Sequence, residues 1–165
     1  MRRLLVAAVV PALAVCALVL PRDGDAALSQ AMPPPEAPTG VGDVTGLTPS
    51  MRRAVARAID AARADGVELR VTSGWRSAEH QRRLYESAIA KYGSASVARQ
   101  WVLPPDESAH VRGEAVDIGP AAGAAWLETY GVRFGLCRRY ANEPWHFERL
   151  APAVGSACPA LEPHA

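Results

Sequence analysis

The sequence at residues 108–117 reads Ser-Ala-His-Val-Arg-Gly-Glu-Ala-Val-Asp. His110 and Asp117 are seven positions apart, so on one straight strand their side chains would face opposite sides of a sheet. Gly113 therefore marks a turn or bulge, because glycine adopts backbone conformations that other residues avoid. The segment Ala-Val-Asp-Ile at residues 115–118, followed by Gly119-Pro120, reads as a buried strand. The pattern predicts a turn that carries His110 and leads into a strand that carries Asp117.

A second polar motif, Glu-Pro-Trp-His, occupies residues 143–146. The flanking segments 134–140 and 145–150 have the patterns of two strands of a hairpin. Glu143 and His146 are three positions apart and cannot share one strand face. We expect Glu143 at the entrance of the second strand and His146 pointing inward from it.

The rest of the folded part reads as helices interspersed with short strands. Thr48 is a good helix N-cap, Pro49 suits the first helical turn and Gly66 suits the stop. By the same criteria we expect a strand at residues 67–72 and helices at 77–91, 95–102 and 122–130. This order predicts an α+β fold in which helices pack on a small antiparallel sheet.

The polar residues of the two motifs suggest a metal site. His110, Asp117 and His146 would form a two-histidine, one-carboxylate ligand set, which zinc accepts while keeping a fourth position for water. Glu143 would lie beside the metal, where a general base belongs. Taken singly, each residue is more readily explained as a surface or hydrogen-bonded group, but together the residues supply the ligand count, an open coordination position and a nearby base. An iron site is the inorganic alternative, but the close His-x-Asp pair usual in iron sites is absent.

Three ordered motifs resemble the D-alanyl-D-alanine carboxypeptidase family of zinc peptidases. They are Ser-Gly-Trp-Arg-Ser at 73–77, the Ser-x-His-x-x-Gly-x-Ala-x-Asp run at 108–117, and Glu-Pro-Trp-His-Phe at 143–147. This group includes the vancomycin-resistance-type carboxypeptidases and shares its fold with the hedgehog signalling domain. The resemblance spans about residues 48–150 and implies a hedgehog/DD-peptidase-like fold.

The resemblance also implies a role for individual residues. It assigns one zinc ion to His110, Asp117 and His146, and catalysis to Glu143 as base and Arg76 as the cation that stabilises the oxyanion. Three further positions would contact substrate: Ser108 and Gln81 near its terminal carboxylate, and Trp75 along the cleft. A turn role for Ser108, an ordinary helix position for Gln81 and simple packing for Trp75 are the alternatives. This chain departs from the family pattern at two places. Trp75 replaces the aromatic of the family's common Ser-Gly-Tyr-Arg-Ser motif, and the stretch between Tyr140 and Glu143 is shorter than in many relatives.

The N-terminal part predicts export. Residues 1–26 combine Arg2-Arg3 with an apolar run and form either a signal peptide cleaved after Ala26 or a membrane anchor. A lipoprotein is less favoured, because Val15 precedes Cys16 where a small residue is expected. Residues 27–47 are rich in Pro and Gly and read as a linker. Residues 48–150 then form the zinc peptidase domain.

The C-terminal segment, residues 151–165, is expected to be a tail. Cys137 and Cys158 are expected to pair, since an exported protein retains disulfides, and the bond would hold this tail on the sheet. A buried free thiol at Cys137 and an unpaired Cys158 are the alternative.

The net charge and the motifs together limit the classes of function that the sequence allows. The formal net charge of +1 argues against a nucleic-acid binder. We expect an extracytoplasmic, monomeric zinc peptidase that acts on peptidoglycan stem peptides, with membrane contact only through the N-terminal segment. Removal of a C-terminal D-alanine is the expected reaction. The alternatives are an endopeptidase of the same family and a non-catalytic zinc-containing domain that binds a cell-wall or other ligand.

Overall fold

A computed structural model describes residues 42–149 and 157–165. The expected leader, with its cleavage position, lies outside the described residues. No helix in the described ranges is both long enough and apolar enough to cross a membrane.

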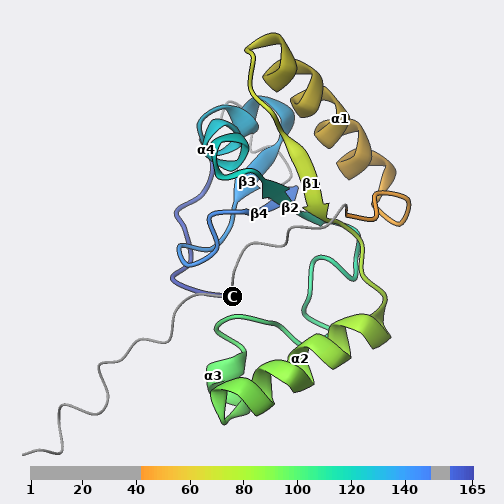
Figure 1. The fold of residues 1–165 in the computed structure, drawn as a ribbon, viewed down its shortest axis with the longest axis vertical. Helices are drawn as coiled ribbons and strands as arrows, with labels where there is room; N and C mark the ends of the chain where they lie inside the picture. The colour runs from red at the N-terminus through yellow and green to blue at the C-terminus, as the bar shows by residue number, and fades with distance from the viewer. Residues whose placement is uncertain (1–41, 150–156) are drawn as a thin grey trace, which may run out of the picture. The chain divides into compact units, whose positions relative to one another are not determined.

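The described part is built on a four-stranded antiparallel sheet in the order β1-β2-β4-β3 (Figure 1). The strands are β1 (Arg70–Ser73), β2 (Ala115–Gly119), β3 (Leu136–Arg138) and β4 (His146–Arg149). The helices are α1 (Pro49–Ala64), α2 (Ala78–Tyr92), α3 (Ala95–Ala98) and α4 (Ala121–Tyr130), with a 3₁₀ turn η2 at Gly131–Phe134. The α+β fold with a small antiparallel sheet is confirmed.

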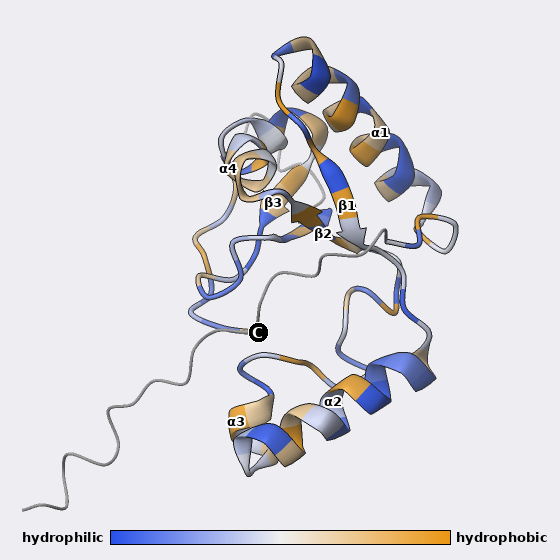
Figure 2. Cartoon of the chain, in the orientation of Figure 1, coloured by the Kyte–Doolittle hydropathy of each residue, from blue (hydrophilic) through white to orange (hydrophobic). Residues whose placement is uncertain are grey.

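Helix α1 begins and ends as its sequence predicts. The Thr48 hydroxyl accepts a hydrogen bond from the Met51 amide at 3.2 Å, and Pro49 occupies the first turn. Gly66 follows the helix with a positive φ of 73°. Polar and apolar residues alternate around α1 in Figure 2, and the apolar stripe faces the core.

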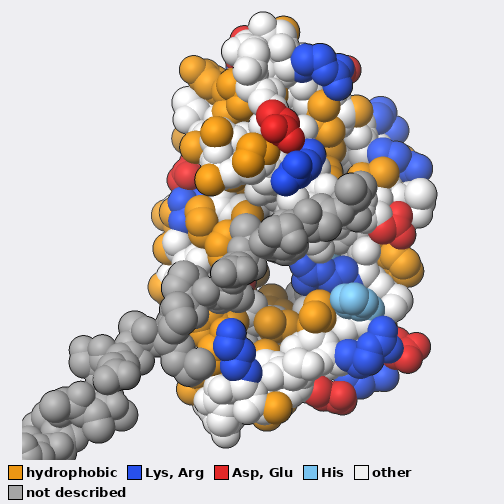
Figure 3. Space-filling view, viewed as in Figure 1, with side chains coloured by type: hydrophobic (Ala, Val, Ile, Leu, Met, Phe, Trp, Pro, Cys, Tyr) orange, Lys and Arg blue, Asp and Glu red, His pale blue; other side chains and the backbone are white. Residues whose placement is uncertain are grey.

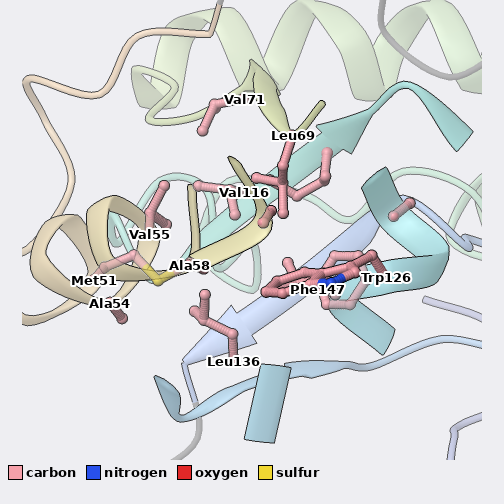
Figure 4. Close-up of a cluster of buried hydrophobic side chains, with 14 of the residues drawn as sticks. Met51, Ala54, Val55, Ala58, Leu69, Val71, Val116, Trp126, Leu136 and Phe147 are labelled. Carbon is pink, nitrogen blue, oxygen red and sulfur yellow. The ribbon is translucent and has the colours of Figure 1, made fainter. Parts of the chain in front are cut away.

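The core lies between α1, α4 and one face of the sheet. Met51, Val55 and Ala58 of α1 point toward Val116 and Phe147 of the two central strands (Figure 4). Because side chains alternate across a strand, the residues next to Val116 and Phe147 point to the opposite face. That second face therefore carries Asp117 and His146.

Several elements are shorter than expected, including β3, which covers only Leu136–Arg138 of the expected 134–140. Strand β1 starts at Arg70 because the Val67 amide bonds to the Ala62 carbonyl and so belongs to the exit from α1. Helix α3 covers only Ala95–Ala98, and separate turns follow it up to the prolines.

Residues 42–47, which the sequence pattern assigned to the linker, pack on the domain. The Gly42 amide donates to the Val71 carbonyl at 3.1 Å, and the Trp75 amide donates to the Asp43 carbonyl at 2.8 Å. Leu47 is buried in the core. The packed structure therefore includes residues before Thr48.

The segment 157–165 also lies on the domain. Cys158 forms a disulfide with Cys137 of β3, with the two Cα atoms 5.6 Å apart. Glu162 forms a parallel β-bridge with Tyr140. The tail is thus attached beside the β3 edge of the sheet.

Candidate active site

Three groups with metal-binding atoms meet on the face of the sheet opposite the core. Asp117 comes from β2 and His146 from β4, and these two residues are paired across the strands. His110 comes from the turn that precedes β2. All three side chains are buried.

The ligand atoms of this group converge on one point. His110 Nε2 lies 3.2 Å from His146 Nδ1 and 3.3 Å from Asp117 Oδ1, and His146 Nδ1 lies 3.2 Å from the same oxygen. Ligands about 2.0–2.1 Å from a tetrahedral zinc ion lie about 3.4 Å apart, so the observed triangle fits that ion. The three residues can hold one zinc ion and leave a fourth position free.

The other nitrogen of each imidazole is held by a polar partner. His110 Nδ1 lies 2.7 Å from the Gly74 carbonyl, which accepts its proton and leaves Nε2 free to bind. His146 Nε2 lies 3.2 Å from Glu148 Oε1. Such partners orient metal-binding histidines and raise their basicity.

Gly113 makes the His110 turn possible. Its φ is 70°, and a Cβ atom there would lie 2.5 Å from the Gly46 carbonyl oxygen. The Thr48 amide also donates to the Gly113 carbonyl at 3.0 Å. The turn is therefore packed against backbone, which places His110 beside the strand that carries Asp117.

Glu143 lies next to the triangle. Its carboxylate Oε2 is 3.7 Å from His146 Nδ1, and the side chain is only 9% exposed. Burial raises the pKa of this carboxyl to about 7, although the charge of His146 opposes the shift. A carboxyl group with this pKa can both accept and donate a proton near neutral pH.

Arg76 holds the other oxygen of Asp117. Its Nη2 atom donates to Asp117 Oδ2 at 2.7 Å, and its Nε atom donates to the Ser73 hydroxyl at 2.9 Å. Its Nη1 atom lies 3.3 Å from Gln81 Oε1. Because 18% of its side chain remains exposed, Arg76 is oriented by these contacts and still borders the cleft.

The charges of the site favour a cation. Burial opposes ionisation of Asp117, but the charges of His110 and His146 and their hydrogen bonds outweigh it and hold the pKa of this carboxyl well below its usual range. Burial also lowers the pKa of His110. For His146, hydrogen bonds with Asp117 and Glu148 overcome burial and raise the pKa to about 10. The carboxylates thus stabilise positive charge among the imidazoles, which is what a metal ion requires.

These groups open into a cleft of about 220 Å³. Ser108 and Gln81 border it and are both buried, and Gln81 Nε2 also donates to the Leu103 carbonyl at 2.8 Å. The apolar wall consists of Leu84 of α2 and the segment 101–103. The cleft therefore combines a polar floor with an apolar side.

Trp75 is placed differently from the expectation. It does not line the cleft but packs over Gly46 and borders a separate hollow, with 37% of its surface exposed. Arg76, the next residue, turns inward to Asp117. Trp145 is instead an aromatic residue that lines the cleft.

Two cleft residues were missed from the sequence. Glu148 follows His146 by two positions on the same strand, so strand alternation would have placed both side chains on one face. Tyr140 lies against His146, with ring centroids 5.3 Å apart. No local sequence signal marks Tyr140, because its position depends on the path of the β3–β4 connection.

Comparison with known proteins agrees with this geometry. The model of the VanY D-alanyl-D-alanine carboxypeptidase family matches residues 45–151. The chain belongs to this family. A D-alanyl-D-alanine carboxypeptidase of Enterococcus faecalis (strain ATCC 700802 / V583) is 39% identical over a match that covers 53% of this chain and 42% of the relative. The chain thus spans less than half the length of that curated relative.

Solved structures of this family have the same fold. The vancomycin resistance D,D-pentapeptidase VanY from a VanB-type resistance cassette, solved as a mutant in complex with Zn(II), is similar with a TM-score of 0.60 and 29% identity. That match covers 72% of this chain and 83% of the other. VanYB in complex with D-alanine-D-alanine is similar with a TM-score of 0.59 and 32% identity, over 64% of this chain and 72% of the other. The neighbour's zinc and the His110, Asp117, His146 group of this chain point to the same cofactor.

Proposed function

We propose that this chain is an exported zinc-dependent peptidase that removes the C-terminal D-alanine from peptidoglycan stem peptides. The observation that carries the proposal is the buried triangle of His110, Asp117 and His146, which opens into a cleft with Glu143 beside it. Similarity to carboxypeptidases and to a structure with bound D-alanine-D-alanine supports the substrate.

His110, Asp117 and His146 would hold one zinc ion through Nε2, Oδ1 and Nδ1. The fit rests on the pairwise distances and on the fixed outer nitrogens of both imidazoles. When bound, zinc supplies a Lewis acid that lowers the pKa of water and polarises a carbonyl oxygen.

Glu143 would act as general base and then as general acid. Its carboxylate would take a proton from the attacking water and deliver it to the leaving amine of D-alanine, so that the C–N bond breaks as a neutral amine departs. The low exposure of Glu143 and its raised pKa support this role.

Arg76 would stabilise the negative charge that develops on the scissile carbonyl oxygen. Its hydrogen bonds to Ser73 and Asp117 hold the guanidinium in place before substrate arrives. A fixed cation aimed at developing charge is a large contribution to catalysis. Ser108 and Gln81, which border the same cleft, would help to bind the terminal carboxylate.

We further propose the domain organisation and location that the sequence predicts. Residues 1–26 would export or anchor the chain. The part of segment 27–47 that precedes the packed residues 42–47 would be a tether, and the domain would act at the cell wall as a monomer. Basic and acidic side chains are interspersed on the face shown in Figure 3. This mixed charge argues against a nucleic-acid partner and is compatible with a cell-wall substrate.

Incubation of the zinc-loaded chain with a pentapeptide ending in D-Ala-D-Ala, followed by mass spectrometry, tests the proposal. We expect loss of one alanine, abolished by a chelator and restored by zinc. Glu143→Gln should lower the rate by about 10²-fold or more, because the proton carrier is lost. The variant should still bind one equivalent of zinc, measured by elemental analysis.

Two other outcomes of this experiment would favour the alternative functions, an endopeptidase or a non-catalytic binding domain. An internal cut in the stem peptide would make the chain an endopeptidase. Absence of cleavage by a chain that holds stoichiometric zinc, with unchanged peptide binding in Glu143→Gln, would favour the non-catalytic binding domain.

A further inference from the structure

The tail segment Cys158–Ala165 is held on the domain at two points. The disulfide from Cys158 to Cys137 fixes its start. Further along, the Glu162 amide donates to the Arg139 carbonyl at 3.0 Å, and the Ala141 amide donates to the Glu162 carbonyl at 2.7 Å. An ion pair between Arg139 and Glu162 adds to this contact at 2.5 Å. The tail therefore lies beside the β3–β4 connection, joined to it by a single parallel β-bridge.

This tail separates two hollows. Ala165 lines the proposed active-site cleft together with Leu103 and Tyr140. The same three residues line a second hollow of about 430 Å³, whose other walls include Arg99, Glu107 and residues 162–164. Because they share these three lining residues, the two hollows are neighbours, and the end of the tail forms part of the boundary between them.

The tail and Arg76 lie at opposite ends of the site. The sheet order is β1-β2-β4-β3, with Asp117 and His146 on the two central strands. Arg76 follows β1 at one edge, whereas the tail is bonded to residues 139–141 after β3 at the other. Figure 1 shows the C-terminal end of the described chain between the sheet and the α2–α3 pair. A peptide with its carboxylate near Arg76 would therefore extend its preceding residues toward the tail.

We propose that the tail, residues 158–165, is a specificity-determining wall that limits the size of the peptide accepted on the side away from Arg76. The inference rests on the proposed function. With the wall in place, the cleft takes a linear stem peptide and excludes one that carries a second stem peptide on the amine of its third residue. Without it, the cleft is open on this side, next to Arg99 and Glu107, and accepts the branched substrate.

The test compares two substrates in three full-length proteins. The substrates are a linear pentapeptide and a cross-linked dimer that retains one D-Ala-D-Ala end. The proteins are the unchanged chain, Glu162→Pro, which loses the Glu162 amide donor and the Arg139 ion pair, and Glu68→Ala as control. The control also removes an exposed ion pair, that of Arg70 and Glu68, but at a position remote from the cleft lining.

We expect the ratio of kcat/KM for the dimer to kcat/KM for the linear peptide to rise several-fold in Glu162→Pro and to stay unchanged in the control. An unchanged or lower ratio in a variant with native zinc content and native circular dichroism would overturn the proposal. If Glu162→Pro does not fold, a chain ending after Cys158, which keeps the disulfide, replaces it.

A second readout is independent of turnover. Trp101 and Trp145 line the cleft, so loss of the wall should make tryptophan fluorescence more sensitive to quenching by acrylamide. If the unchanged chain released no D-alanine, the proposed function would be refuted but the role of the tail would not. The quenching experiment would still test whether the tail shields the cleft. Equal quenching in all three proteins would refute the proposal that the tail closes one side of the cleft.

Discussion

At the scale of single residues, Asp117 links the two halves of the proposed chemistry. One carboxylate oxygen faces the two imidazoles, and the other accepts a hydrogen bond from Arg76. Arg76 is therefore both a cation at the cleft and the counter-ion of a buried carboxylate. Removal of Arg76 would disturb the metal site as well as the substrate, so its variants report on two roles at once.

Glu148 offers a cleaner test of how the site is held. It touches His146 Nε2 from the side away from Asp117, and 15% of its side chain is exposed. We expect Glu148→Ala to weaken zinc binding about 10–100-fold, because the orienting partner of His146 is lost. Competition with a chromogenic chelator measures the affinity.

Glu114→Ala is the matched control for Glu148. It removes a carboxylate whose partner, Arg112, is an exposed surface residue. Equal zinc affinities in Glu148→Ala and in the unchanged chain would show that Glu148 does not position His146.

At the scale of elements, the two central strands carry core residues on one face and the residues of the candidate site on the other. Val116 and Phe147 enter the core on one face, and their neighbours Asp117 and His146 form the site on the other. A shift of one residue in the pairing of β2 with β4 would reverse both faces. The apolar face therefore fixes the register that brings the polar residues together.

The turn before β2 supplies the element-scale prediction. Gly113→Ala should destabilise the domain by more than about 1 kcal/mol, because alanine is strained at this φ and its Cβ would meet the Gly46 carbonyl. Thermal or chemical unfolding followed by circular dichroism measures the change.

Gly66→Ala is the control for Gly113→Ala. Gly66 has a similar φ of 73°, but a Cβ atom there meets open space. The difference between the two variants isolates the backbone clash. If they are equally stable, the packing of the His110 turn against Gly46 is not a constraint.

At the scale of the whole molecule, the tail and the sheet are joined by a bond that spans 21 residues of sequence. The pairing of Cys137 with Cys158 constrains the unfolded chain more than the folded one. We expect the double variant Cys137→Ser, Cys158→Ser to lose about 3 kcal/mol of unfolding free energy. Denaturant titration in the absence of reductant measures this loss.

Reductant provides the check on the disulfide prediction. It should lower the stability of the unchanged chain toward that of the double variant and leave the double variant unaffected. A reductant effect of the same size in both proteins would assign the loss to another part of the molecule.

Features that depend on short-range patterns could be predicted from the sequence. The N-caps Thr48 and Ser77 were predictable because capping involves a side chain and amides within one helical turn. The α+β class followed from the periods of the apolar residues. The motifs at residues 108–117 and 143–147 identified His110, Asp117 and His146 as a candidate ligand group.

Which distant groups meet depends on the packing of the whole domain. His110 and His146 are 36 positions apart, and the distance between their nitrogens depends on the register of β2 with β4. The outward position of Trp75 and the placement of Ala165 at the cleft were equally beyond local patterns. Each depends on the path of the backbone between elements, because packing of the whole core determines that path and no single segment encodes it.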